Sequence, residues 1–343
     1  MNEEKDLRPR IAITMGDPAG IGPEIILKAL GQKAIYEACR PVVYGDIKWM
    51  QKTAAILLSA ANRAKSEGGF DRWNQPDLEP VHQATEADLS LVRWGELSAQ
   101  AGMAAAQCVI AAAQAALRGE VDAIVTAPLN KEAMALGGYP YPGHTELLAD
   151  VTHTPRYGML LLSGNLRVVH VSTHVSLREA IARVRTERVL ECIRLGARAC
   201  RDLGIAAPRI AVAGLNPHAG EHGLFGTEEA TEIIPAVLAA QSENILVSGP
   251  YPPDTVFARA ANGDFDLVVA MYHDQGHIPV KLHGFETGVN VTIGLPIIRV
   301  SVDHGTAFDI AGKGVASEQS LLEAIRVAVQ MVHAKRAIPH PLS

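Results

Sequence analysis

The sequence predicts an α/β protein whose parallel or mixed sheet is flanked by helices, and two observations support this fold class. Short apolar runs alternate along the chain with longer segments of helical periodicity, which is the order expected of strands joined by helical crossovers. Several of the apolar runs stop at a group of polar residues, most clearly within residues 266–281. Because open α/β sheets bind ligands beyond the carboxyl ends of their strands, the same pattern predicts where a site lies.

In the first half of the chain we expect strands at residues 10–15, 41–46 and 121–127. Helices are expected at residues 23–30 and 97–117. Pro23 suits the first turn of a helix, and Gly22 suits its cap. The Ala-rich segment 97–117 has a helical pattern and ends at Gly119. The glycines of residues 16–24 (GDPAGIGPE) fit neither G-x-G-x-x-G nor a P-loop, so locally they predict a tight turn between strand and helix.

In the second half we expect strands at residues 167–173, 209–213, 266–270 and 288–298. Helices are expected at residues 177–182 and 187–203, from about residue 228, and at 317–335. Pro235 should bend the third of these helices, and Ser317 should cap the last. The polar segment after Tyr272 is expected to be a loop.

The composition is that of an ordinary globular protein. Its 343 residues, 48% hydrophobic and 20% charged, allow two domains of usual size. The net charge of −6 argues against a general polyanion binder, and hence against a nucleic-acid partner. The four cysteines form no C-x-x-C pair, the N-terminal segment lacks an apolar leader, and no run of about 18 apolar residues occurs. We therefore expect a cytoplasmic protein without a membrane partner.

Three of the expected strands are followed by a histidine, namely His174, His218 and His273. Imidazoles from separate strand ends suit a divalent metal with open positions for substrate. Each histidine alone is more often a loop or core residue, and only their recurrence favours a metal site. His277 and His283 are expected near this cluster. The other histidines are expected to be structural or exposed: His82, His153, His170, His222, His333 and His340.

A second set of residues is suited to binding an anion: His144, Thr145, Lys281, Asn290 and Arg299. Lysine and arginine near the metal candidates of an acidic chain indicate a negatively charged small substrate. The alternative is that Lys281 and Arg299 merely form surface ion pairs.

Residues 303–314 (DHGTAFDIAGKG) resemble the loop with which isopropylmalate and isocitrate dehydrogenases bind the adenosine half of their cofactor. Residues 16–24 similarly resemble an elaboration of the N-terminal G-D-G-I-G-P-E of those enzymes. The resemblance implies NAD or NADP as cofactor without a Rossmann fingerprint. The cofactor contacts it implies are Asp303, His304, Gly305, Thr306 and Asp309.

Seven motifs between residues 14 and 314 resemble the 4-hydroxythreonine-4-phosphate dehydrogenase (PdxA) family: TMGDPAGIGPE, PGHTE, THVSLREA, GLNPHAGE, YHDQGHIPVK, GVNVTIGLPIIR and SVDHGTAFDIAGKG. This resemblance implies that His174, His218 and His273 hold one divalent ion per site, either zinc, cobalt or magnesium. It implies substrate contacts by the anion-binding set, and a homodimer whose active sites are shared between subunits. It also implies an isocitrate/isopropylmalate-dehydrogenase-like fold of two α/β/α domains with an active-site cleft between them. Their expected limits are residues 1–128 with about 300–343, and about 129–299.

Within the family, YHDQGHIPVK and AFDIAGKG look closest to the branch that oxidises 4-phospho-D-threonate or 4-phospho-D-erythronate. The implied reaction is NAD(P)- and metal-dependent oxidation of the 3-hydroxyl with decarboxylation of the 3-keto acid. Lys281 is the expected acid/base and Asp274 the residue that orients a ligand. Val300 departs mildly from the family, which has threonine there.

Four alternatives stay open. Two are a 4-phosphohydroxy-L-threonine dehydrogenase of pyridoxal phosphate biosynthesis and a terephthalate-type cis-diol dehydrogenase. A non-redox zinc hydrolase or lyase is the rival from another class. A pure binding protein is the last, and it leaves residues 303–314 without a role.

Overall fold

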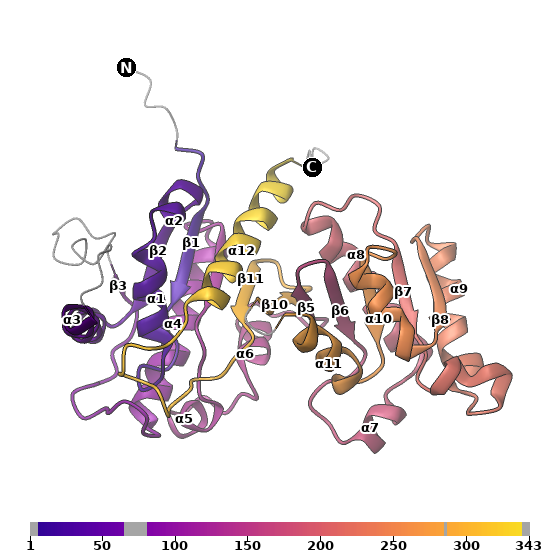
Figure 1. Cartoon of the computed structure of the whole chain (residues 1–343), viewed down its shortest axis with the longest axis horizontal. Helices are drawn as coiled ribbons and strands as arrows, with labels where there is room; N and C mark the ends of the chain where they lie inside the picture. Colours follow the sequence, from indigo (N-terminus) through magenta and orange to yellow (C-terminus); the bar gives the residue numbers. More distant parts are fainter. Residues whose placement is uncertain (1–5, 65–80, 285–286, 338–343) are drawn as a thin grey trace. The chain divides into compact units, whose positions relative to one another are not determined.

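The computed structural model describes residues 6–64, 81–284 and 287–337, and the chain divides into two compact units (Figure 1). Unit 1 consists of Met1–Pro155 and Leu295–His333, and unit 2 of Arg156–Gly294 and Ala334–Ser343. The sequence places these boundaries near residues 128 and 299. The first boundary falls later in the structure because α5 (Lys131–Leu136) and α6 (His144–Val151) pack against α4 (Ala99–Leu117) of unit 1.

Unit 1 is built on parallel strands in the order β3-β2-β1-β4-β11. These strands are β1 (Arg10–Thr14), β2 (Arg40–Gly45), β3 (His82–Gln83), β4 (Ala123–Thr126) and β11 (Ile298–Val302). Nearly every residue of β1, β4 and β11 is buried, as expected of parallel strands that are covered on both faces. The register pairs Thr126 with both Thr14 and Ser301, so hydroxyl side chains align at the carboxyl ends.

Two helices of unit 1, α4 and α5, begin at a residue whose side chain caps them. Ser98 accepts a hydrogen bond from the Ala101 amide at the start of α4, and Asn130 accepts one from the Ala133 amide at the start of α5. Gly102 lets these two helices touch, because a Cβ there would lie 1.9 Å from the Ala133 carbonyl oxygen. The remaining helices are α1 (Gly22–Leu30), α2 (Lys33–Ala38), α3 (Ile47–Ala64) and α12 (Gln319–Ala337).

Helix α4 is long and apolar enough, by length and composition alone, to cross a membrane. In this fold, however, 56% of its apolar window is buried inside the protein. It packs against β1, β2 and β4 as well as α5 and α6. Its composition is therefore that of a core helix.

Unit 2 has a mixed sheet in the order β10-β5-β6-β9-β7-β8. The strands are β5 (Gly158–Ser163), β6 (Leu166–His170), β7 (Ile210–Ala213), β8 (Val247–Tyr251), β9 (Leu267–Ala270) and β10 (Val289–Ile293). Strands β6, β9, β7 and β8 run parallel, whereas β5 is antiparallel to both β6 and β10. The α/β fold class predicted from the sequence is confirmed.

Helices cover both faces of this sheet. Val168, Ala211 and Val268 share a row of one face, where they join the core formed with α10 (Pro253–Ala261) and α11 (His273–His283). The other face packs against α8 (Thr186–Asp202), where a Cβ on Gly196 would lie 2.3 Å from Leu267 Cδ2. The remaining helical segments are α7 (Leu177–Ala182), η2 (Pro217–Gly223), η3 (Glu229–Ile233) and α9 (Ile234–Ser242).

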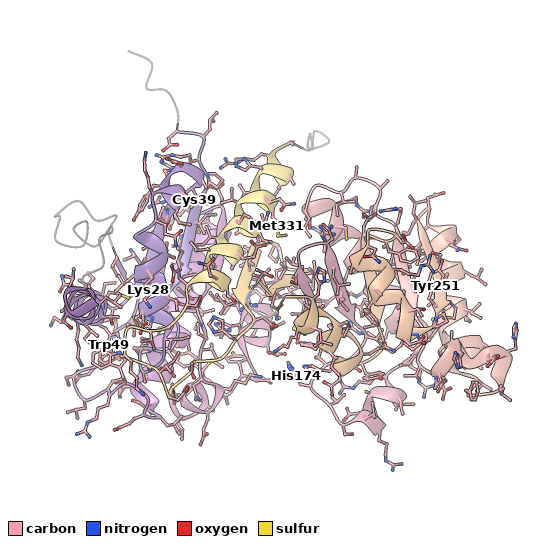
Figure 2. All side chains as sticks on the ribbon, viewed as in Figure 1. Lys28, Cys39, Trp49, His174, Tyr251 and Met331 are labelled. Atoms are coloured by element: carbon pink, nitrogen blue, oxygen red, sulfur yellow. The ribbon has the colours of Figure 1, made fainter. Side chains whose placement is uncertain are left out.

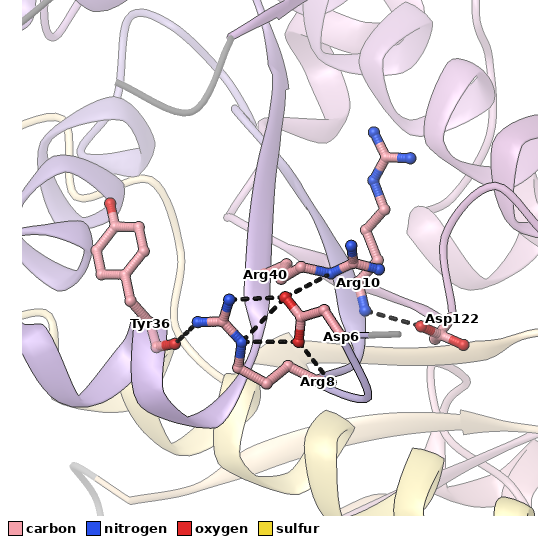
Figure 3. Close-up of polar contacts among 6 residues, drawn as sticks. All are labelled: Asp6, Arg8, Arg10, Tyr36, Arg40 and Asp122. Atoms are coloured by element: carbon pink, nitrogen blue, oxygen red, sulfur yellow. Dashed lines mark hydrogen bonds and ion pairs between the residues drawn. The ribbon is translucent and has the colours of Figure 1, made fainter. Parts of the chain in front are cut away.

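A polar network holds the chain just before β1 (Figure 3). The Arg8 guanidinium binds the Asp6 carboxylate, with Nη2 and Oδ2 2.7 Å apart, and also donates to the Tyr36 carbonyl. Arg40 lies 3.7 Å from the same carboxylate, and the Arg10 amide donates to Asp122 Oδ2 at 2.7 Å. Hydrogen bonds from Arg8 lower the pKa of Asp6 well below its usual value. These contacts join the start of β1 to α2, β2 and the segment before β4.

Each of the four cysteines is buried with a free thiol: Cys39, Cys108, Cys192 and Cys200. Burial raises the pKa of every one of these thiols, to about 12 for Cys39 and to about 11 for Cys192. Thiols with such high pKa values are inert toward oxidation and alkylation, because the thiolate is the reactive form.

Several predicted elements differ from the structure. The expected strand 167–173 already ends at His170 with β6, and Pro235 stands in the first turn of α9, after the π-helix η3, and does not bend a helix. The expected strand 288–298 ends at Ile293 with β10, because Gly294 breaks the run with a φ of 93°, and β11 begins only at Ile298. The expected loop after Tyr272 is helix α11, even though Gly276 and Pro279 lie inside it. Helix-disfavouring residues are tolerated there because α11 packs on β5 and β6.

Candidate functional site

Two of the three histidines predicted as metal ligands lie together in unit 2. His174, labelled in Figure 2, lies on the segment that follows β6, and His273 is the first residue of α11, which follows β9. Strands β6 and β9 are parallel neighbours, with His170 paired to Ala270 at their carboxyl ends. The two ring centroids are therefore only 5.7 Å apart. His174 is exposed and His273 half-buried, so ligands can reach both rings.

Asp274 fixes the orientation of the His273 ring. His273 Nδ1 lies 2.7 Å from Asp274 Oδ1. A carboxylate that accepts the Nδ1 proton fixes the ring orientation and leaves Nε2 free for a metal. This contact is the one that the predicted orienting role of Asp274 requires.

Two more histidines extend this group beneath His273. The His277 ring stacks on that of His273, with centroids 3.6 Å apart and planes 12° apart, and its Nδ1 lies 3.1 Å from the His273 carbonyl oxygen. The His170 ring lies 4.7 Å from that of His277, and Gly276 leaves room for it. Burial, followed by the neighbouring imidazoles, lowers the pKa of His170 well below its usual value, and that of His277 falls to about 4. Both rings are neutral at physiological pH.

His218 lies apart from this group within the described chain. It belongs to η2, after β7, and it is exposed with its ring centroid 5.9 Å from that of Phe225. Across residues 6–64, 81–284 and 287–337, no three histidine, cysteine or acidic side chains converge closely enough to hold a metal ion. One chain therefore brings together His174 and His273 and leaves His218 on its surface.

In unit 1 a buried cation lies beside a neutral imidazole. Arg299 of β11 is only 2% exposed, and its Nη2 donates to Thr126 Oγ1 at 2.7 Å. Burial lowers the pKa of Arg299 to about 9, which leaves it charged at neutral pH. Burial, then Arg299 and Lys131, lower the pKa of His144 well below its usual value. His144 Nε2 is buried and has no hydrogen-bond partner among the described residues, so this group suits an anion that also accepts or donates a hydrogen bond.

The remaining anion-binding candidates are divided between the units. Thr145 follows His144 on α6 in unit 1. Lys281 is exposed on α11, and Asn290 is half-buried on β10, both in unit 2. The alternative that Arg299 forms a surface ion pair is wrong, because its side chain is buried.

The segment 303–314 is anchored to the glycine-rich turn before α1. The Ile21 amide donates to the Thr306 carbonyl at 3.0 Å, and a Cβ on Gly20 would lie 2.8 Å from Thr306 Cβ. Glu24 accepts hydrogen bonds from the Gly314 and Ala316 amides, and it pairs with Lys28 (labelled in Figure 2) at 2.9 Å. The turn therefore holds this segment as well as joining a strand to a helix.

The residues at these positions are chemically suited to the divalent metal and the nicotinamide cofactor that the sequence motifs imply. An imidazole pair with one ring oriented by a carboxylate suits zinc or cobalt, for which nitrogen ligands are preferred. The segment 303–314 offers open backbone to a nucleotide, because a Cβ on Gly305 would meet nothing within 4 Å. The other predicted cofactor contacts, Asp303, His304, Thr306 and Asp309, are half-buried or exposed along it.

Sequence reasoning missed several residues of these groups. His170 was expected to be structural or exposed and proves buried beside the metal candidates, and Thr126 and Lys131 adjoin Arg299 and His144. A hydroxyl at the end of a buried strand was a usable signal for Thr126. No pattern in the sequence pointed to His170. His340 lies outside the described residues.

Comparison with known proteins gives consistent results. The family model described as pyridoxal phosphate biosynthetic protein PdxA matches residues 37–328. A D-threonate 4-phosphate dehydrogenase of Cupriavidus necator is 49% identical over 332 residues, which cover 95% of this chain and 98% of that protein. A 4-hydroxythreonine-4-phosphate dehydrogenase of Desulforapulum autotrophicum is 47% identical, with 94% and 95% covered. The crystal structure of a 4-hydroxythreonine-4-phosphate dehydrogenase from Klebsiella pneumoniae is 46% identical with a TM-score of 0.83, covering 94% of this chain and 99% of that one.

Proposed function

Since this chain belongs to the PdxA family, as its seven motifs predicted, we propose that it is an NAD(P)- and metal-dependent dehydrogenase of 4-phospho-D-threonate. The observation that carries this proposal is the near-full-length identity of 49% with a D-threonate 4-phosphate dehydrogenase. The relative named for 4-hydroxythreonine 4-phosphate is 47% identical, and both names describe a 4-phosphorylated four-carbon acid. 4-Phospho-D-erythronate, which differs only in stereochemistry, is the alternative substrate.

The metal site that we propose is shared between two copies of the chain. His174 and His273 of one copy would supply two imidazoles, and His218 of the other copy would supply the third. The proposal is supported by the pairing of the first two rings and by the exposure of His218, which meets no such group among the described residues of its own chain. When bound, the ion would lower the pKa of the substrate hydroxyl and stabilise negative charge on its oxygen during oxidation and decarboxylation.

The residues of unit 1 would bind the negative groups of the substrate. Arg299 is charged, buried and fixed by Thr126, so it offers a preorganised cation that needs no rearrangement on binding. His144 is neutral, and its Nε2, which has no partner within the described part of the chain, would form a hydrogen bond with a phosphate or carboxylate oxygen. Thr145 and Asn290 are the further contacts that the family resemblance implies.

Lys281 would move the protons. Its amine would take the proton of the 3-hydroxyl while the hydrogen on C3 leaves as hydride, for which a bound nicotinamide supplies the acceptor. The resulting 3-keto acid loses CO₂ by cleavage of the C1–C2 bond, and the Lys281 ammonium would then return a proton to C2. Asp274 would keep the His273 ring oriented throughout.

A coupled absorbance assay tests this function. The purified chain, supplied with zinc, cobalt or magnesium, is mixed with NAD or NADP and one phosphorylated acid at a time. We expect reduced nicotinamide and CO₂ in equal amounts with 4-phospho-D-threonate, and slower turnover with 4-phospho-D-erythronate and 4-phosphohydroxy-L-threonine. A cis-dihydrodiol should give none. Absence of nicotinamide reduction with every acid, cofactor and metal would leave the hydrolase or lyase as the better proposal.

A further inference from the structure

The turn that carries His218 has an unusual backbone. Five successive residues, His218–His222, have positive φ angles of 53°, 54°, 77°, 40° and 57°. Only the middle residue, Gly220, is a glycine, the one residue type that adopts this conformation without a steric penalty. A left-handed run of this kind persists only where surrounding contacts enforce it, and such runs occur mainly at functional sites.

One buried carboxylate supplies those contacts. Glu229 is 4% exposed, and its Oε1 accepts hydrogen bonds from the Leu215 amide at 2.8 Å and the Asn216 amide at 2.7 Å. Its Oε2 accepts another from Asn216 Nδ2 at 3.0 Å. Gly220 packs against the same carboxylate so closely that a Cβ there would lie 2.6 Å from Oε2. The Glu229 side chain thus holds the two residues Leu215 and Asn216, just before the turn, by hydrogen bonds and packs against Gly220 in its middle.

Glu229 is presented by η3, a π-helix that leads directly into α9. Wide turns of this kind are rare and are often found at functional sites. A second carboxylate of the same π-helix, Glu232, faces another segment: it accepts hydrogen bonds from the Thr186 amide at 2.8 Å and from Arg185 Nη1 at 3.0 Å. The chain therefore contains two comparable carboxylates on one element, of which only Glu229 touches the turn.

We propose that Glu229 is a positioning residue that enforces the left-handed turn and so holds His218 outward, where a second copy can use it as a metal ligand. The proposal rests on the proposed function in that it takes His218 to bind metal. Its physical basis is that a buried carboxylate must keep its three donors, and those donors fix the backbone that precedes His218. Without them, the residues with positive φ can relax toward the right-handed region, and the His218 ring loses its direction.

The test compares two variants of equal chemistry, Glu229→Gln and Glu232→Gln, in the full-length protein. Zinc affinity is measured by competition with a chromophoric chelator, and backbone hydrogen exchange is followed over residues 214–223. Glu229→Gln should lower zinc affinity by about 10- to 100-fold, the usual effect of losing a residue that supports a ligand. It should also speed exchange in the turn. Glu232→Gln should alter neither, even if it lowers the melting temperature.

Two further variants make the result decisive. Asn216→Ala removes the Nδ2 contacts to Glu229 and to Glu228 Oε2 but keeps both backbone donors to Glu229, so it should weaken zinc binding in the same direction by less, and it serves if Glu229→Gln does not fold. His218→Ala sets the affinity of a site without this ligand. Weak binding in His218→Ala with wild-type affinity and exchange in Glu229→Gln would overturn the positioning role alone. Wild-type affinity in His218→Ala would contradict the proposed metal site instead, and the exchange rates would still show whether Glu229 holds the turn.

Discussion

Asp17 is a buried acid whose surroundings oppose its ionisation. Its side chain is completely buried, with Oδ1 accepting a hydrogen bond from the Ala19 amide at 2.8 Å. Oδ2 is buried without a hydrogen-bond partner in the described chain. Burial therefore raises the pKa of Asp17 to about 6, against the lowering effect of the Ala19 and Asn130 amides. The residue is protonated more readily in the folded than in the unfolded chain.

The first prediction follows from this raised pKa. An acid with a higher pKa when folded stabilises the fold at low pH, and the protein loses that stability as pH rises from about 4 to about 6. Asp17→Asn keeps the bond from the Ala19 amide and removes the ionisation. It should raise the unfolding free energy at pH 8 by at most about 3 kcal/mol, and by nothing at pH 4, as measured by urea unfolding.

The control for this measurement is Asp88→Asn. A hydrogen bond from the Ser90 amide lowers the pKa of that exposed carboxyl, so its replacement should slightly destabilise the protein at pH 8. A pH-independent effect of Asp17→Asn would show that Asp17 titrates as an ordinary acid.

Lys281 offers a test of the anion site that does not disturb packing, because its side chain is exposed. Lys281→Ala should lower kcat/KM for both 4-phospho-D-threonate and D-threonate, because both need the proton transfers proposed for this residue. The loss should be roughly ten- to a hundredfold larger for the phosphorylated acid, which also loses a charge-assisted contact of about 1.5–3 kcal/mol. Arg178→Ala, another exposed cation of unit 2, should leave both values unchanged. Equal losses on the two substrates would show that Lys281 does not bind phosphate.

At the scale of elements, the packing of α11 on β6 positions the rings of His273 and His277. Gly276 faces the strand, where a Cβ would lie 2.3 Å from His170 Nε2 and 2.7 Å from Val168 Cγ1. The stacked rings of His273 and His277 stand on the same helix. If α11 could not pack this closely on β6, both rings would therefore be displaced.

Gly276→Ala tests this packing, because the substitution has two opposite effects on the stability of the protein. Alanine favours a helix by about 1 kcal/mol over glycine, whereas overpacking costs typically 1–3 kcal/mol. The contact distances are so short that we expect overpacking to win and the unfolding free energy to fall, with weaker zinc binding. Leu282→Ala, at an exposed position of the same helix, should change neither. A more stable Gly276→Ala protein would mean that α11 has room to shift.

Local signals predicted the elements that local chemistry determines. Ser176 caps α7, and its predicted limits, 177–182, agree with the structure. The sequence could not predict α11, because Gly276 and Pro279 are unfavourable for a helix and only packing on the sheet compensates for them. The left-handed turn was equally hidden, since residues such as Ala219 give no signal for a positive φ, which Glu229 enforces from another element.

The candidate site, too, has features that the sequence predicted and features that it could not predict. Histidines that follow strand ends could be found from the alternation of strands and polar segments, and β6 and β9 do bring His174 and His273 together. Strand β7 is the parallel neighbour of β9, so nothing indicated that the turn after β7 would leave His218 apart from them or that His170 would lie beneath His277. Tertiary contacts between distant segments determine those positions.

At the scale of the whole molecule, the prediction concerns copies of the chain that lack different histidines. If His218 is donated to a second copy, a dimer of His218→Ala and His174→Ala chains retains one intact site, and so does His218→Ala with His273→Ala. A dimer of His174→Ala and His273→Ala chains retains none. The first two mixtures should regain at most about half of wild-type activity after subunit exchange, and the third should stay inactive.

The activity of each mixture is compared with the activity of each single mutant alone, which should be inactive. Recovery by His174→Ala with His273→Ala would mean that these two ligands come from different copies. No recovery in any mixture, with exchange proven by mass spectrometry of tagged chains, would show that each site is built within one chain.

The burial of the four cysteines makes this protein unusually convenient for attaching probes. Because its own thiols are buried and have raised pKa values, a maleimide dye should not react with them while the protein is folded. One new cysteine at Leu224, a residue that is 71% exposed next to the His218 turn, would then carry the only label. Fluorescence from that single position can report, without removing any native residue of the core, when one molecule meets another.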